Sequence, residues 1–148
     1  MSEQEYAVWG PAAQAGYAAD MIANGGVAEE IAHAKAEKDF ATLLSEGIGT
    51  PGHWLYTIVE DGDPAGELWL AERGGDLGKS LFVYDVHVRE ERRGRGLGRA
   101  AMVFAEEEAR RRGLPNVALN VFGGNEVARG LYRSLGYRES AVWMVKDV

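Results

Sequence analysis

The stretch that most constrains this chain is residues 81–112, which reads LFVYDVHV, then REERRGRGLGR, then AAMVFAEEEARRR. Its first part is mostly β-branched, aromatic and aliphatic, a composition typical of a strand. Its last part places apolar residues roughly on one face and charged residues on the other, as an amphipathic helix does. The stretch therefore predicts a strand, a tight loop and a long helix in succession.

The loop carries three glycines at alternate positions, Gly94, Gly96 and Gly98, interleaved with arginines. A turn without side chains lets backbone N–H groups approach an anion closely. The N-terminus of the helix that follows adds partial positive charge at the same place. The sequence therefore predicts a phosphate-binding loop.

Other phosphate-binding and hydrolytic motifs fail on spacing. The dinucleotide fingerprint needs glycine at position 99, which is Arg, and no acidic residue lies in the strand predicted next. A Walker-like run at 74–80 lacks its first glycine and precedes a strand, so it predicts a hairpin turn. The chain has no Gly-x-Ser-x-Gly or His-Glu-x-x-His motif, and its 3 histidines are scattered.

The pattern that does fit is Arg93-x-x-Gly96-x-Gly98, and there the chain resembles the GCN5-related N-acetyltransferase (GNAT) family. Downstream, Leu119-Asn120-Val121-Phe122 precedes a second block that resembles the family's other cofactor motif. That block is Asn125-x-x-Ala128-x-x-Leu131-Tyr132-x-x-Leu135-Gly136-Tyr137. The resemblance covers residues 54–146, and the first 50 residues follow the family less closely.

The resemblance implies an α/β (α+β) fold in a single acetyltransferase domain, residues 1–148. Its twisted sheet would be mixed and mostly antiparallel, with splayed parallel central strands and helices on both faces. Residues 1–50 would form the helical acceptor side, and residues 81–137 the cofactor-binding core. The family's usual strand before the first helix has no room here, so either the sheet lacks an edge strand or the native chain is longer.

Local patterns predict the remaining elements. Ser2 and Glu5 form a capping box for a helix reaching about residue 24, interrupted at Gly10-Pro11 and stopped by Gly25-Gly26. Further elements are a helix at 28–44, strands at 54–60, 65–72 and 116–122, a short helix at 125–135 and a closing strand at 138–146.

The resemblance implies acetyl-CoA as co-substrate and no metal. The pantetheine would pair with the backbone of Val86 and Val88 between the splayed strands, and an N–H there would polarise the thioester. Asn125 and Ala128 would also contact the cofactor, with Asn125 capping its helix as well. The pyrophosphate would bind the loop formed by Arg93, Gly94, Arg95, Gly96, Leu97, Gly98 and Arg99.

Acyl transfer from a thioester to an amine needs a base, an oxyanion donor and an acid for the departing thiolate. Tyr132 matches the family's tyrosine that protonates the thiolate. Asp85 and His87 are candidate bases on one strand face, with Tyr84 on the other unless a bulge resets the alternation; Glu67 or a water chain would also serve. Tyr84 and Asn120 are candidate substrate-binding residues, Asn120 either orienting the acceptor or bridging the strands through water.

The predicted function is acetyl-CoA-dependent N-acetylation of a primary amine by direct attack in a ternary complex, on a small amine or a protein amino group. The alternative is a non-catalytic acyl-CoA-binding module or sensor on the same fold. A formal charge of −7 disfavours nucleic acid as a partner, although arginines gather near the loop.

The chain has no cysteine, no signal-peptide pattern and no apolar run of membrane-spanning length, so we expect a cytoplasmic protein that does not enter membranes. The aromatic residues Trp9, Tyr17, Trp54 and Trp69 would line the acceptor pocket or fill the core, and the core is favoured. Family habit adds a homodimer through the final strand or the first helices.

Overall fold

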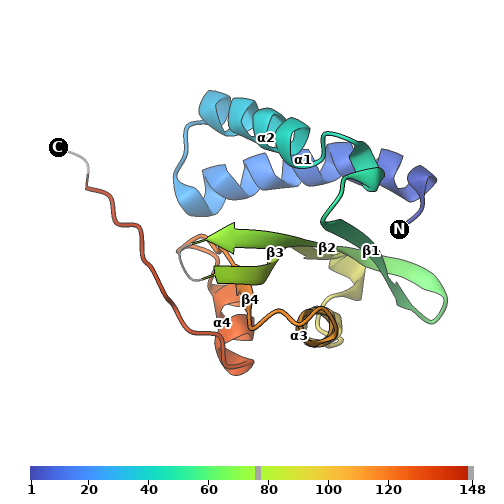
Figure 1. Ribbon diagram of the computed structural model, residues 1–148. Helices are drawn as coiled ribbons and strands as arrows, with labels where there is room; N and C mark the ends of the chain where they lie inside the picture. Colours follow the sequence, from blue (N-terminus) through green and yellow to red (C-terminus); the bar gives the residue numbers. More distant parts are fainter. Residues whose placement is uncertain (76–77, 147–148) are drawn as a thin grey trace.

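A computed structural model describes residues 1–75 and 78–146 (Figure 1). Its helices are α1 (Glu3–Gly25), α2 (Glu29–Leu43), α3 (Leu97–Arg111) and α4 (Glu126–Ser134). Its strands are β1 (His53–Glu60), β2 (Asp63–Gly75), β3 (Gly78–Val88) and β4 (Val117–Leu119). Two short 3-10 turns, Gly47–Gly49 and Glu90–Arg92, complete the described elements.

The strands form one mixed sheet in the order β1-β2-β3-β4. The pairs β1/β2 and β2/β3 are antiparallel, and β3/β4 is parallel. Helices α1 and α2 cover one face of this sheet, whereas α3 and α4 lie on the other (Figure 1). This arrangement confirms the predicted fold class.

The two faces of the sheet have separate cores because side chains alternate along a strand. Leu68 and Leu70 of β2 point to the α3 side, where they pack with Met102. Trp69, between them, points to the α1 side and packs with Trp9. Each layer of helices is therefore held by its own apolar contacts, and the sheet is a shared wall between them.

Helix α1 confirms one local prediction and overturns another. Ser2 and Glu5 form the expected capping box, and Gly26 ends the helix in the left-handed conformation at φ 66°. The predicted interruption at Gly10-Pro11 is wrong, since the helix continues through Pro11. An interior proline costs about 3 kcal/mol or more, and the burial of Trp9 and Met21 on either side offsets that cost.

The predicted hairpins are present, with longer strands than expected. Asp61 and Gly62, both at positive φ, form the two-residue turn between β1 and β2. Gly75 pairs with Gly78 at the tip of the β2/β3 hairpin, where residues 76–77 of the predicted turn lie outside the described residues. The strand predicted at 116–122 shortens to Val117–Leu119.

The closing strand predicted at 138–146 is wrong, because these residues have no regular structure. A strand needs a neighbour to pair with, and this segment runs away from the body of the molecule (Figure 1). Its Trp143 is 91% exposed. The described residues also contain no strand ahead of α1.

Candidate active site

The central feature of the site is the point where β3 and β4 separate. Their parallel pairing covers only Leu81 to Val83 of β3, so among the described strands the later part of β3 has no partner on that side. The N–H of Arg89 bonds to Ala65 of β2. Since backbone groups alternate in direction along a strand, Val86 and Val88 direct theirs into the gap.

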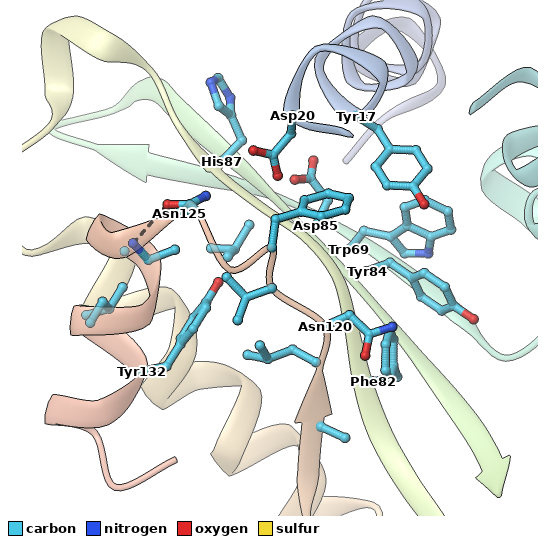
Figure 2. Close-up of a pocket in the computed structure, with 18 of the residues that line it drawn as sticks. Tyr17, Asp20, Trp69, Phe82, Tyr84, Asp85, His87, Asn120, Asn125 and Tyr132 are labelled. Atoms are coloured by element: carbon cyan, nitrogen blue, oxygen red, sulfur yellow. Dashed lines mark hydrogen bonds between the residues drawn. The ribbon is translucent and has the colours of Figure 1, made fainter. Parts of the chain in front are cut away.

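A β-bulge reshapes β3 at this gap. Leu70 pairs with Val83 and Trp69 with Asp85, which leaves Tyr84 as an extra residue. Tyr84 stacks on Trp69 with ring centroids 4.7 Å apart, on the side of the sheet that faces α1. The bulge resets the alternation, which was the exception to placing Tyr84 on the face opposite Asp85, and Figure 2 shows both side chains on the cavity side.

The glycine loop has the backbone geometry expected of an anion site. Gly94 and Gly96 have φ of 77° and 84°, a region that side chains strongly disfavour. Gly96 is the N-cap of α3 and has no side chain to accept from the first turn. The N–H groups of residues 97–99, which have no partner within the helix, are thus available to the oxygens of a phosphate.

The arginines near the loop are less uniformly available than the sequence suggests. Arg92 and Arg95 both bind Glu60, with N–O distances of 3.0 and 3.1 Å. Arg93 donates from Nε to the Val88 carbonyl at 3.0 Å, and Arg99 donates to Ser134 at 2.6 Å. Among the described residues, Arg93 and Arg99 have no carboxylate partner, so their charges remain available to an anion.

Helix α4 brings two predicted residues to the opposite side of the gap. Asn125 is the N-cap, accepting from the N–H of Ala128 at 3.1 Å, and its capping role is confirmed. The hydroxyl of Tyr132 points into the cavity (Figure 2). Burial, with smaller contributions from Asp85 and Asp20, raises the pKa of Tyr132 to about 12. The phenol is therefore protonated at neutral pH.

The two candidate bases occupy different environments. Burial raises the pKa of Asp85 to about 6, with Glu67 adding to the shift and His87 opposing it. The exposed His87 binds Glu67 through Nδ1 at 3.0 Å, and this contact raises the pKa of His87. Figure 2 shows the His87 ring pointing away from Tyr132.

Asn120 follows β4 at the edge of the cavity. Its side chain is exposed and is drawn beside that of Phe82 (Figure 2). It borders the same cavity as Tyr84. The structure therefore brings Asn120 to the outer part of the site rather than to its centre.

The sequence predicted residues 1–50 on the acceptor side and Trp9 and Tyr17 in the pocket or the core, but its patterns missed Asp20. Trp9, Tyr17 and Asp20 line the same cavity as Asp85 and Tyr132. The carboxylate of Asp20 faces that of Asp85 (Figure 2), and Asn24 donates to Asp20 from one turn later. Helical spacing puts these residues on one face of α1, but no local motif indicates which side of the sheet that face meets.

Comparison with known proteins decides the family. The model of the acetyltransferase (GNAT) family matches residues 25–137. The chain belongs to the GNAT family. It is accordingly an enzyme of the N-acetyltransferase class. No cluster of potential metal ligands occurs in the part of the GNAT chain that the structure describes, and no helix there is long and apolar enough to cross a membrane.

Two relatives from Bacillus subtilis are similar over most of this GNAT chain, and both are uncharacterised N-acetyltransferases. YdgE is 30% identical over 149 residues, covering 100% of this chain and 95% of the relative. YycN is 31% identical over 133 residues, covering 89% and 85%. The solved structure of YycN superposes with a TM-score of 0.89 over 100% of this chain.

A mycothiol acetyltransferase of Nocardiopsis dassonvillei is 38% identical over 109 residues. That match covers 70% of this chain but only 28% of the relative.

Proposed function

We propose that this GNAT protein transfers the acetyl group of acetyl-CoA to a primary amine by direct attack in a ternary complex. The observation that carries the proposal is the placement of Tyr132 and Asp85 around one cavity at the gap between β3 and β4 (Figure 2). The glycine loop borders the same cavity. A thioester held in the gap would therefore have a proton donor and a proton acceptor within one site.

The reaction follows from these positions. The amine nitrogen attacks the thioester carbonyl carbon and loses a proton to the base, while a backbone N–H of β3 at Val86 stabilises the oxyanion. The C–S bond then breaks, and Tyr132 gives its proton to the departing thiolate. The products are the N-acetyl amine and free CoA, and solvent restores the two side chains to their starting protonation states.

Asp85 is the base in this proposal. A carboxylate with a pKa of about 6 is ionised at neutral pH and is a stronger base than an ordinary Asp. His87 has its ring engaged by Glu67 and points away from the cavity centre. Glu67 is itself paired with His87 and lies 3.8 Å from Arg89, so it is held by two cationic or hydrogen-bonding neighbours.

The cofactor contacts we propose follow the backbone. The backbone groups of Val86 and the N–H of Val88 pair with the pantetheine. The Val88 carbonyl does not take part, because it already accepts from Arg93. The N–H groups of residues 97–99 and the charges of Arg93 and Arg99 bind the pyrophosphate. Asn125 keeps its side-chain NH2 available, since only its carbonyl oxygen is used in capping Ala128.

A calorimetric titration with acetyl-CoA tests this function, with NAD and ATP as competitors. Gly96→Glu puts a carboxylate into the loop at a positive φ and should weaken acetyl-CoA binding by at least about 100-fold. Gly10→Glu is the matched control, because nothing lies within 4 Å of its Cβ on α1. Equal acetyl-CoA affinity in the two variants would show that the loop does not bind the cofactor. Binding of acetyl-CoA without acetylation of any amine would favour a sensor.

We also propose a homodimer formed through the C-terminal segment, residues 138–146. Val142, Trp143, Met144 and Val145 are 69–91% exposed, a run that a soluble monomer rarely presents. This segment and the outer edge of β4 have no strand partner among the described residues, and a second copy would supply both at once. Light scattering should give a dimer mass, and Trp143→Ser should shift it toward the monomer.

The location we propose is the cytoplasm. The absence of cysteine from the sequence is compatible with a reducing compartment. Fractionation of cells that make the native protein would test this, and recovery outside the cytoplasm would contradict it.

A further inference from the structure

Two carboxylates from different elements face each other in the cavity. Asp20 comes from α1 and Asp85 from the bulged part of β3, and Figure 2 shows their oxygens directed toward one another. Neither carboxylate forms an ion pair within the described part of the chain. Both carboxylates add to the burial that raises the pKa of Tyr132.

Asp20 is held in position rather than mobile on the helix surface. Asn24, one turn further along α1, donates a hydrogen bond to Asp20 Oδ1. By contrast, Asp39 of α2 lines the same cavity but is neutralised by Lys35 at 2.6 Å. The uncompensated negative charge of the cavity is thus concentrated at Asp20 and Asp85, next to the proposed reaction centre.

A buried donor on α1 supplies an independent indication of a ligand. Trp9 is only 6% exposed, and its indole N–H has no hydrogen-bond partner among the described residues. Trp9 lines the same cavity, and its N–H is directed toward the Asp85 carboxylate, whose pKa it lowers, without reaching hydrogen-bond geometry. A buried N–H without an acceptor is costly, so an uncharged oxygen of a bound molecule would satisfy this donor.

Aromatic rings form the wall beyond these groups. Trp69 and Tyr84 stack at 4.7 Å, and Tyr84 meets Phe82 at 4.8 Å. Tyr17 faces the same space from α1 (Figure 2). Such a wall suits an apolar or aromatic substituent next to a cationic group.

Resting on the function proposed above, we propose that Asp20 and Asp85 together bind the acceptor as an ammonium ion, and that the cavity selects amines whose neighbouring group is an uncharged carbonyl. An α-amino amide has this chemistry: its ammonium lies between the carboxylates, its carbonyl accepts from Trp9, and its side chain meets the aromatic wall. Asp85 removes one proton before attack and releases it to solvent, so that it can accept the second proton as the C–N bond forms, while Asp20 keeps its charge and positions the nitrogen. A free amino acid is disfavoured, because its carboxylate would lie beside two others.

Three probes of one skeleton test this selectivity: phenylalanine amide, phenethylamine and phenylalanine. The wild-type kcat/KM should fall in that order, with the amide preferred over the amino acid by about 100-fold or more, as close like charges predict. Asp20→Asn should raise KM for the amide about tenfold, change kcat little and reduce the amide-to-acid ratio severalfold. Trp9→Phe should lower the kcat/KM of phenylalanine amide to that of phenethylamine, because of these two only the amide has an oxygen that accepts from the indole N–H.

Glu37→Gln is the matched control for Asp20→Asn. It removes the same charge from an exposed position on α2 outside this cavity, so the relative kcat/KM values of the three probes should not change. The affinity of each variant for acetyl-CoA should also stay at the wild-type value, which separates acceptor binding from the loop.

Affinities of the same three amines for the enzyme saturated with CoA separate the two proposals. Acetyl transfer without preference among the probes, or an Asp20→Asn variant that keeps the wild-type preference, would overturn the inference and leave the transferase function standing. The predicted order of affinities without any acetyl transfer would support the inference and count against the function.

Discussion

The glycine loop and the acceptor cavity lie at the same gap in the sheet but are built differently. The loop is one continuous segment between β3 and α3, and the anion site proposed there uses mainly backbone N–H groups. The acceptor cavity takes Asp20 from α1, Asp85 from β3 and Tyr132 from α4, residues that are more than a hundred positions apart at the extremes. A backbone site depends on the conformation that its glycines allow, whereas an assembled site depends on each side chain.

This difference gives the two regions distinct expected responses to mutation. Changes in the loop should alter cofactor affinity and leave chemistry on bound cofactor intact. Changes in the cavity should alter turnover or acceptor KM and leave cofactor affinity intact. The following predictions, ordered by expected effect, test that separation.

Asp85→Asn should lower kcat by roughly 100- to 1,000-fold, because the base is lost while the side-chain shape is kept. The base acts when ionised, so the wild-type rate should fall as pH decreases below about 6, and this acidic limb should vanish in the variant. The measurement is a pH profile of single-turnover rate. His87→Ala is the control, and an acidic limb lost there but kept in Asp85→Asn would reassign the base to His87.

Tyr132→Phe should lower kcat by roughly 10- to 100-fold and change the acetyl-CoA Kd by less than about twofold. The phenol is mainly needed when the thiolate leaves, so a thioester with a more acidic thiol should recover much of the lost rate. Stopped-flow comparison of the two thioesters measures this recovery. Equal losses on both would show that Tyr132 acts through packing instead.

Asp85→Asn should also stabilise the fold at pH 8. The pKa of Asp85 is higher folded than its ordinary value of 3.8, so ionisation costs stability above that value, and the cost disappears as pH falls through about 6 toward 4. Because Asp85 is only partly buried, we expect a gain on the order of 1–2 kcal/mol at pH 8 and little at pH 4. Thermal melts at both pH values test the sign, and a lower Tm at pH 8 would contradict it.

Asn125→Ala should have the smallest effect, and it should alter both the stability of α4 and the affinity for acetyl-CoA. Losing the cap of α4 should cost about 1 kcal/mol of stability, and losing the free side-chain NH2 should weaken acetyl-CoA binding a few fold. Asn125→Asp keeps the capping oxygen and removes the NH2, so denaturant melts and calorimetry on the two variants separate the roles. Wild-type affinity for acetyl-CoA in both variants would show that Asn125 does not contact the cofactor.

The sequence predicted the loop side well because its information is local. Glycine spacing identified the turn at Gly94 and Gly96, and Asn125 was identified as a cap from the residues beside it. Prediction from the sequence failed where the local conformation depended on residues far away along the chain. Pro11 remained helical because packing around it outweighed a local preference, and the segment 138–146 pairs with none of the described strands.

The acceptor side shows most clearly what a sequence leaves open. Strand alternation alone predicts Tyr84 on the face opposite Asp85. The bulge in β3 directs both side chains toward α1, and this bulge depends on how β2 pairs with β3. Asp20 belongs to no motif, and only the packing of α1 on the sheet brings its carboxylate to Asp85.

The sequence by itself determined the family, the glycine turn ahead of α3 and the cap of α4 at Asn125, since each rests on residues close together along the chain. Tertiary structure alone decided which carboxylates line one cavity, which arginines form ion pairs and which face Tyr84 occupies. The physical reason is that charge pairing, burial and strand register are set by contacts between segments far apart in sequence.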